Sequence, residues 1–204
     1  LLVILGGKKI HTKIETLEAF LRAGARVCIG GALATPFYEA QRCGIGRSSY
    51  DKIDLPLARR LLAEYPNQLI LPEDIVTVRA IRRRAPQTLS VCGKVEDRGI
   101  IADIGPLTAR RFQREMSAAK TIVWNGPLGI VETPDFARGT HAVVKAMAKE
   151  TGRAMTVVGG GDTVPVIDAL KLHHAFTLVS TGGGAMMSFL AGQNLPGLEV
   201  LKME

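Results

Sequence analysis

Hydrophobic and polar positions along this chain alternate between two kinds of segment, from its first residues to its last. Short runs that are apolar almost throughout are typical of parallel strands, because both faces of such strands are buried. Longer segments with apolar residues three and four positions apart are typical of amphipathic helices. Strands are predicted in this way at residues 1–5, 26–29, 68–71, 88–91, 121–124, 155–158 and 177–180.

Helices are predicted between these strands, and the first of them has the clearest pattern. Ile14, Leu17 and Leu21 share one face of it, and Thr12 and Glu15 have the spacing of a capping box. Alternating strands and helices predict a parallel sheet covered by helices, and 204 residues suffice for one large α/β domain. The predicted helices span residues 13–22, 54–65, 108–118, 136–149, 163–170 and 185–191.

Composition narrows the expected partners and setting. The chain has 26 Lys and Arg against 19 Asp and Glu, a net charge of +7, which favours anionic partners. Its densest basic run, residues 82–84, has no interleaved aromatic residues, so nucleic-acid binding is not expected. The three cysteines suit neither a disulfide framework nor a zinc site, which favours a reducing, cytoplasmic setting.

The apolar runs and the first residues of the chain support two further predictions, on membrane association and on the length of the parent protein. No apolar run approaches the roughly 20 residues that span a bilayer, and no secretory leader pattern is present, so no membrane association is expected. The first five residues lack an initiator Met and already have the pattern of a buried strand. We therefore expect the chain to begin partway through a longer protein.

Glycine-rich turns follow many of the predicted strands. The carboxyl ends of parallel strands share the edge of the sheet where ligands bind. Glycine permits positive φ and close approach of backbone N–H groups, so such turns can hold phosphate oxygens at helix N-termini. A tight connection without a ligand is the alternative for any single turn. The turns are Gly6-Gly7, Gly30-Gly31, Gly126, Gly159-Gly160-Gly161 and Gly182-Gly183-Gly184.

Lysines follow the first glycine turn. Lys8, Lys9 and Lys13 lie between Gly7 and the body of the first predicted helix. A cation in a first helical turn opposes the helix dipole, at a cost of a few tenths to about 1 kcal/mol unless an anion compensates it. The pattern therefore favours a bound polyanion, with lysines extended into solvent as the alternative.

Asp162 follows the triple-glycine turn after residue 158 and precedes Thr163. Asp162 could cap the following helix, in which Pro165 suits the first turn. Beside a polyphosphate, however, a carboxylate is favourable mainly when a divalent cation lies between the two charges. Mg²⁺ held by one carboxylate, phosphate oxygens and waters fits this pattern, and Thr163 could donate hydrogen bonds to the same phosphates.

Asn125 and Glu132 are weaker candidates. Asn125 lies in Trp124-Asn125-Gly126-Pro127, where its amide could contact phosphate or simply serve the turn. The carboxylate of Glu132 suits paired ribose hydroxyls, with a solvated loop charge as the alternative.

Taken together, these segments resemble phosphoglycerate kinase over essentially the whole chain. Five separated motifs in the right order are far more specific than a single glycine fingerprint. The matching stretches are Leu5-Gly6-Gly7 with Lys9 and Lys13, Ile29-Gly30-Gly31, Asp103-Ile104-Gly105-Pro106, Val123 to Pro127 with Glu132, Val157 to Thr163, Ser180 to Ala185, and Leu195-Pro196-Gly197.

The resemblance implies a three-layer Rossmann-like domain with a six-stranded, mainly parallel sheet. Residues 1–204 would form the C-terminal, nucleotide-binding domain of an enzyme that transfers a phosphoryl group between 1,3-bisphosphoglycerate and Mg-ADP in glycolysis. Such transfer needs positioning and charge neutralisation more than a covalent catalyst. Because the reacting group is already a carboxylate, no His is assigned a catalytic role.

The resemblance also implies residue roles. Lys9, Lys13 and the amides of Gly183 and Gly184 would face the transferred group, and Asp162 would hold Mg²⁺. The residues expected to bind nucleotide are Gly6, Gly7, Lys13, Gly30, Gly31, Ile101, Ala102, Asn125, Pro127, Glu132, Gly160, Gly161, Asp162 and Thr163.

Some positions depart from the family pattern. Lys8 stands where an Ala is common, Thr12 where an Asp is usual, and Ala32 where a third glycine is usual. Lys8 and Ala32 could alter the adenine pocket, so these departures bear on nucleotide affinity more than on phosphate chemistry.

The family's N-terminal half, which binds 3-phosphoglycerate, has no counterpart in the sequence. Catalysis in the family depends on closure of two halves over both substrates. We therefore expect this chain to bind ADP or ATP without turnover, and the parent enzyme to be a monomer.

Two other functions stay open. A Rossmann oxidoreductase is prompted by the same glycine turns, but the first strand is followed by Gly-Gly-Lys-Lys rather than Gly-x-Gly-x-x-Gly, and no acidic residue closes a second strand. A nucleotide-binding module without catalysis is the other alternative, against which Lys9, Lys13, Asp162 and Thr163 argue.

Overall fold

The main sheet confirms the predicted architecture. The computed structural model describes residues 1–7, 10–11, 13–91 and 94–201. Its six-stranded sheet has the order β3-β2-β1-β7-β8-β9, and all neighbouring strands are parallel. The strands are β1 (Leu2–Leu5), β2 (Arg26–Ile29), β3 (Leu69–Ile70), β7 (Thr121–Asn125), β8 (Met155–Gly159) and β9 (Leu178–Ser180).

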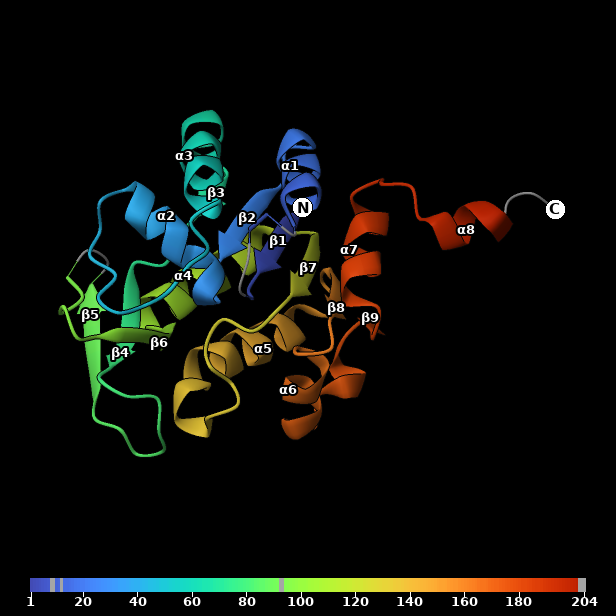
Figure 1. Ribbon diagram of the computed structural model, residues 1–204. Helices are drawn as coiled ribbons and strands as arrows, with labels where there is room; N and C mark the ends of the chain where they lie inside the picture. Colours follow the sequence, from blue (N-terminus) through green and yellow to red (C-terminus); the bar gives the residue numbers. More distant parts are fainter. Residues whose placement is uncertain (8–9, 12, 92–93, 202–204) are drawn as a thin grey trace.

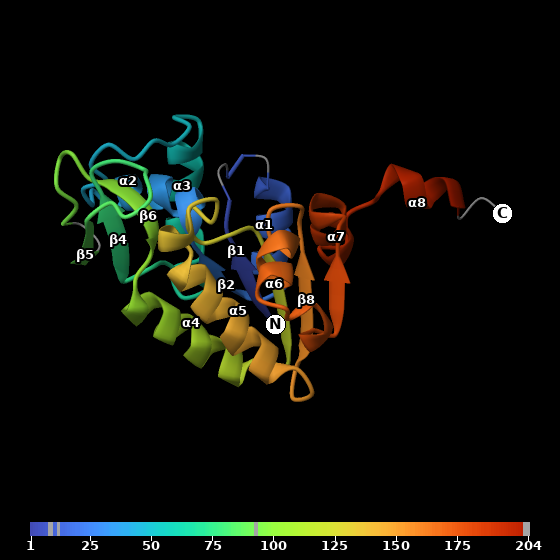
Figure 2. The same ribbon diagram turned by 90° about the horizontal axis from the view of Figure 1, so that it is seen from below.

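Helices cover both faces of this sheet and make three layers (Figures 1 and 2). Successive residues of β1 point to opposite faces, so Val3 and Leu5 lie in one core while Leu2 and Ile4 lie in the other. The first core packs against α1 (Ile14–Arg22), α2 (Thr35–Ala40), α3 (Asp54–Glu64) and α7 (Gly183–Leu190). The second packs against α4 (Pro106–Ala118), α5 (Arg138–Glu150) and α6 (Val164–Ala169).

A second, three-stranded sheet lies between β3 and β7 in the chain. Its order is β5-β4-β6 and its pairings are antiparallel. The strand predicted at residues 88–91 belongs to this sheet, so its expected place in the parallel sheet was wrong. Leu89 and Val91 are apolar but exposed, since β5 is an edge strand with one solvated face. The strands are β4 (Asp74–Val78), β5 (Gln87–Val91) and β6 (Ile100–Ile104).

Buried aspartates join the second sheet to the helices. Asp74 of β4 accepts hydrogen bonds from the backbone N–H groups of Leu107 (2.9 Å) and Thr108 (2.7 Å) at the start of α4. Asp103 of β6 accepts one from the N–H of Gly139 (2.6 Å) in the first turn of α5. Each carboxylate thus satisfies N–H groups that a helix start leaves unpaired.

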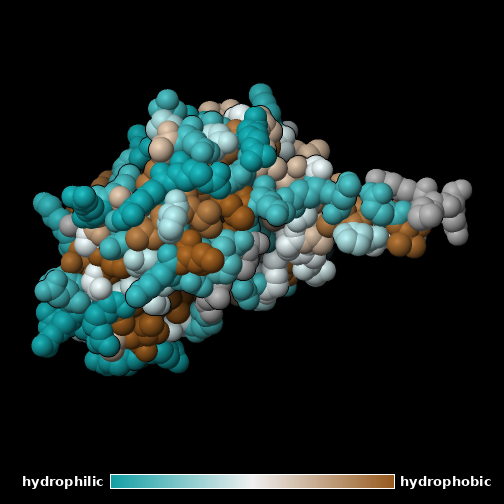
Figure 3. Space-filling view, turned by 45° about the horizontal axis from the view of Figure 1, so that its top comes forward, coloured by the Kyte–Doolittle hydropathy of each residue, from teal (hydrophilic) through white to brown (hydrophobic). Residues whose placement is uncertain are grey.

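The predicted helices correspond to α1, α3, α4, α5, α6 and α7, whereas α2 and α8 (Pro196–Leu201) were not predicted. Helix α1 starts after Lys13, and no side-chain hydrogen bond caps it; Thr12 of the predicted capping box lies outside the described residues. Helix α8 extends away from the rest of the molecule (Figures 1 and 3). Short 3-10 helices occupy Gly31–Ala34, Pro134–Phe136 and His173–Ala175.

Candidate functional site at the sheet's switch point

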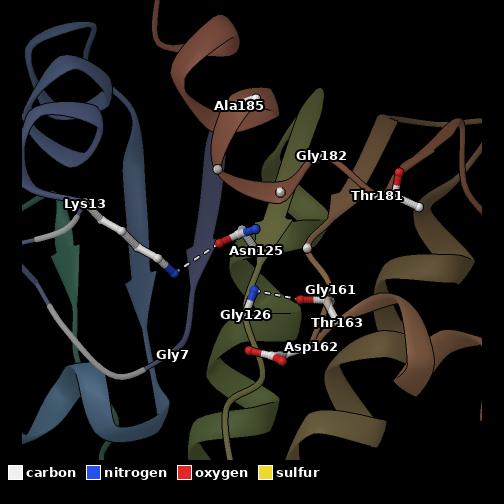
Figure 4. Close-up of a pocket in the computed structure, with 13 residues that line it drawn as sticks. Gly7, Lys13, Asn125, Gly126, Gly161, Asp162, Thr163, Thr181, Gly182 and Ala185 are labelled. Carbon is white, nitrogen blue, oxygen red and sulfur yellow. Dashed lines mark hydrogen bonds between the residues drawn. The ribbon is translucent and has the colours of Figure 1, made fainter.

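A cleft lies at the carboxyl edge of the main sheet, where the strand order reverses direction. The chain runs outward from β1 to β2 and β3, then returns to place β7 on the other side of β1. In open α/β sheets, ligands bind at this switch point. The cleft has a volume of about 540 Å³ and is lined by turns that follow β1, β7, β8 and β9. Its lining residues are Gly7, Lys13, Asn125, Gly126, Gly160 to Thr163, and Thr181 to Ala185 (Figure 4).

Glycine is required at several of these turns. Gly7 and Gly160 have φ of 110° and 118°, which side-chain-bearing residues rarely adopt. A Cβ on Gly6 would lie 2.0 Å from the carbonyl oxygen of Pro127, because the turns after β1 and β7 pack directly on each other. A Cβ on Gly183 would lie 2.5 Å from Cα of Gly160. Because these glycines have no side chains, the turns can pack closely and still leave the cleft open, with backbone peptide groups lining much of it.

Lys13 brings its positive charge into this cleft from the N-terminus of α1. Its Nζ donates to the carbonyl oxygen of Gly6 (2.9 Å) and to Oδ1 of Asn125 (3.0 Å), as Figure 4 shows for the second bond. Burial lowers the pKa of Lys13, and the charge of Asp162 partly opposes that shift. The cation is thus fixed at the cleft and partly desolvated, which strengthens its attraction for an anion.

Asn125 and Thr163 hold the turns of the cleft together. The Nδ2 of Asn125 donates to the carbonyl oxygen of Gly159 (2.8 Å), and its Oδ1 receives Lys13. Thr163 is fully buried, and its Oγ1 accepts a hydrogen bond from the N–H of Gly126 (2.8 Å). These bonds join the turn after β8 to the turn after β7.

Asp162 is exposed in the cleft. Thr163, and not Asp162, occupies the N-cap position of α6, and the cap has no side-chain hydrogen bond. The alternative that Asp162 serves as a helix cap is therefore wrong. In Figure 4 its carboxylate lies across the cleft from Lys13.

The cleft brings together many of the predicted site residues, though not all of them. Gly6, Gly31 and Pro127 pack together next to Gly7: the N–H of Gly7 donates to the carbonyl oxygen of Pro127 (3.2 Å), and a Cβ on Gly6 or Gly31 would meet the same oxygen. Ile101 and Ala102 lie on β6, and Ala102 accepts a hydrogen bond from the N–H of Ile130 (2.8 Å). Predicted residues that do not line the cleft are Gly6, Gly30, Gly31, Ile101, Ala102, Pro127 and Glu132, the last of which is exposed.

Lys9, the other predicted catalytic lysine, lies outside the described residues, as does Lys8. Sequence reasoning missed Thr181 and Ala185, which line the cleft beside the second triple-glycine turn. Their position next to Gly182 to Gly184 was the available signal.

The fold and the cleft place this chain among doubly wound α/β proteins with glycine-rich turns at the topological switch point. Comparison with known families then names the particular one. The model of the phosphoglycerate kinase family matches residues 1–193, so the chain belongs to that family.

Named relatives and solved structures agree with this assignment. The chain is 40% identical over 202 residues to phosphoglycerate kinase of Chlorobium phaeobacteroides, covering 97% of this chain and 51% of the relative. It is 42% identical over 198 residues to that of Solibacter usitatus, covering 97% of this chain and 50% of the relative. The structure of phosphoglycerate kinase from Coxiella burnetii superposes with a TM-score of 0.91 at 35% identity, covering 98% of this chain and 52% of that one.

These relatives are about twice as long as the chain, which therefore spans about half of each. The structure from Pyrococcus horikoshii shows the same proportion, with a TM-score of 0.84, 30% identity, and coverage of 98% of this chain and 51% of that one. Within the described ranges, no helix is both long and apolar enough to cross a bilayer.

Proposed function

We propose that this chain is the C-terminal, nucleotide-binding half of a phosphoglycerate kinase and binds Mg-ADP or Mg-ATP in the cleft at the switch point. The observation that carries the proposal is the position of Lys13, whose Nζ is fixed at the cleft by Gly6 and Asn125 beside two glycine turns. A half-buried cation beside these peptide groups suits the phosphate chain of a nucleotide. The cleft volume of about 540 Å³ is in the range of small-ligand sites.

The phosphates would lie against the starts of α6 and α7. A helix start carries partial positive charge that attracts phosphate, although at α6 the N–H groups of Thr163 and Val164 already donate to the carbonyl oxygen of Gly160 (2.9 Å each). Gly161 and Gly184 have open space where a Cβ would project, so a ligand can approach their backbone closely. Gly30, Gly31, Ile101 and Ala102 would extend the site toward the base, and Glu132 toward the ribose.

The residues at the cleft fit a magnesium ion bound with the nucleotide. Asp162 is exposed there and serves no capping role, so its carboxylate is available as a ligand. Within the described residues, no three acidic, His or Cys side chains gather into a metal site, so Asp162 would be supplemented by phosphate oxygens and waters. When bound, Mg²⁺ neutralises phosphate charge during transfer.

For the transfer itself, the chain would supply positioning and charge. Lys13 would neutralise negative charge on the transferred group, and the amides of Gly183 and Gly184 would orient it. Lys9, which the structure does not describe, is proposed to assist in the same neutralisation of charge. The phosphoryl group would pass between ADP and the acyl phosphate of 1,3-bisphosphoglycerate, whose carboxylate is the leaving group, so no general base is needed.

The chain of 204 residues spans about half the length of its family relatives. We propose that it binds nucleotide without completing phosphoryl transfer. Binding of 3-phosphoglycerate and closure over both substrates would depend on the other half. A glycolytic, cytoplasmic and monomeric parent enzyme forms part of the same proposal. Phosphoryl transfer by this chain alone above a buffer blank would contradict its proposed inactivity.

Calorimetric titration with ADP tests the proposal. We expect binding in the presence of Mg²⁺ that weakens about tenfold in Asp162→Ala or when Mg²⁺ is chelated, with no further loss when the two changes are combined. Asp168→Ala is the matched control, because Asp168 is an exposed aspartate of α6 that does not line the cleft. It should bind as the unaltered chain does.

Two results would contradict the proposal. Absence of ADP binding to the folded chain would remove the nucleotide-binding function. Binding that is equally strong with Asp162→Ala and retains its Mg²⁺ dependence would remove the metal role of Asp162 while leaving the nucleotide site.

A further inference from the structure

Asp54 is a fully buried carboxylate in the first turn of α3, and it holds a segment of chain that is distant in sequence. Its Oδ2 accepts a hydrogen bond from the N–H of Ile10 (3.1 Å), and its Oδ1 accepts one from the N–H of His11 (2.9 Å). Nδ1 of His11 lies 2.7 Å from the same Oδ1. One side chain thus receives two backbone donors and an imidazole from neighbouring residues.

The segment held by Asp54 leads directly to the cleft. The N–H of Lys13 donates to the carbonyl oxygen of Ile10 (2.7 Å), so the bond at Ile10 fixes the turn from which Lys13 departs. Ile10 is also fully buried in the core, and the preceding Gly7 is fixed through its carbonyl oxygen by Leu33 N–H (2.8 Å). Asp54 itself does not line the cleft.

We propose that Asp54 is a positioning residue that holds Lys13 in register for the phosphates of the nucleotide, an inference that rests on the proposed function. A carboxylate suits this place because its two oxygens can accept both backbone N–H groups as well as an Nδ1–H of His11. The start of α3 favours its negative charge. An amide has one acceptor oxygen, and its NH₂ group would face a donor, so Asp54→Asn removes at least one of these bonds while preserving the size of the side chain.

Asp74 provides a matched control, because it is another buried aspartate whose carboxylate accepts hydrogen bonds from backbone N–H groups. It is also buried and accepts hydrogen bonds from Leu107 N–H, Thr108 N–H and the hydroxyl of Thr108 at the start of α4. Neither Asp74 nor its partners line the cleft. A purely structural role for Asp54 predicts that Asp54→Asn and Asp74→Asn have the same consequences.

The first measurement is hydrogen exchange without nucleotide. We expect the amides of Ile10 and His11 to lose protection in Asp54→Asn and to keep it in Asp74→Asn. NMR titration with Mg-ADP should then show a Kd about tenfold higher for Asp54→Asn and unchanged for Asp74→Asn. NMR titration reaches millimolar Kd values, so weakened binding stays measurable.

A double-mutant cycle separates positioning of Lys13 from a general loosening of the cleft. In a Lys13→Met background, Asp54→Asn should change the Kd by less than about twofold, because the cation that it positions is gone. An equal loss in both backgrounds would overturn the inference. If Asp54→Asn does not fold, His11→Ala removes only the imidazole contact. It should raise the Kd severalfold in the chain that keeps Lys13 and leave the Kd unchanged in the Lys13→Met background.

The inference and the proposed function fail in different ways. If the unaltered chain does not bind ADP, the proposed function fails. If the unaltered chain binds ADP and Asp54→Asn or, where that variant does not fold, His11→Ala binds it equally well, only the positioning role fails.

Discussion

Asp103 shows how one buried side chain can join two parts of the molecule and make its stability depend on pH. Burial raises the pKa of Asp103 to about 7, although hydrogen bonds from Gly139, Ile104 and Thr140 favour the ionised form. A Cβ on Gly129 would lie 2.3 Å from Oδ1 of Asp103, so the chain between β7 and α5 passes close to this carboxyl. Its protonation state therefore affects the contacts that connect β6 with the start of α5 and with the segment around Gly129.

The free energy of unfolding should fall as pH rises from 3.8 to about 7, because Asp103 ionises at lower pH in the unfolded chain than in the folded one. Between pH 3.8 and about 7, the folded state keeps a proton that the unfolded state has released. The stabilisation is fully present below the unfolded pKa of 3.8 and is lost as pH rises through the folded pKa of about 7. Between these two values the free energy of unfolding falls by up to about 1.4 kcal/mol per pH unit.

Urea unfolding between about pH 5 and pH 8 measures this slope against Asp103→Asn, which cannot ionise at this position. The stability of the unaltered chain relative to the variant should decline across the range and level off above the folded pKa. Parallel pH profiles for the two proteins would contradict the shifted pKa.

At the level of elements, the start of α7 packs onto the turn after β8, and two adjacent glycines of α7 have different surroundings. A Cβ on Gly183 would meet Cα of Gly160 at 2.5 Å and Nδ2 of Asn125 at 2.9 Å. A Cβ on Gly184 would meet nothing within 4 Å. The helix start is thus tightly fitted on one side and open toward the cleft on the other.

This difference predicts opposite outcomes for two alanine substitutions. Gly183→Ala should destabilise the chain by about 1–3 kcal/mol, because backbone must shift to admit the methyl group. Gly184→Ala should be neutral or slightly stabilising, since alanine favours a helix by roughly 0.5–1 kcal/mol over glycine. Thermal unfolding of both variants measures the contrast, and equal stabilities would contradict the packing of α7 on the turn.

The strands also show which elements the sequence could predict and which it could not. Most strands of the main sheet were predictable because they are short apolar runs buried on both faces, as β1 is, whereas the edge strand β9 is only partly buried. The pattern missed β4 and β6, since a buried acidic residue, Asp74, stands at the start of the apolar run of β4 and another, Asp103, interrupts that of β6. Their partners at the starts of α4 and α5 lie 33 to 36 positions away, so local periodicity does not reveal them.

The candidate site was predictable in its composition but not in its contacts. Glycine turns after strands indicated which segments would meet at one edge of the sheet. The bond between Lys13 and Asn125 joins residues 112 positions apart, and the bonds to Asp54 span 43 and 44 positions. Asp54 also has an ordinary place for an acidic residue, in a first helical turn, which gave no sign of its partners.

At the scale of the whole molecule, a second cleft competes with the first as a ligand site. It has a volume of about 620 Å³ and is lined by residues of α2, α3 and α4, including Arg59 and Arg111. Volume and positive charge therefore do not distinguish the two clefts. Position does, because of these two clefts only the first lies at the carboxyl ends of the main sheet's strands, at the switch point between β1 and β7, and carries glycine turns and Lys13.

An amide NMR titration of the chain with Mg-ADP is the most direct test of a nucleotide site at the switch point. The signals of Gly126, Gly160 to Thr163 and Gly182 to Gly184 should shift in proportion to occupancy, while those around Arg59 and Arg111 stay in place. Shifts confined to the second cleft, or none at saturating nucleotide, would contradict the assignment of a nucleotide site to the switch point.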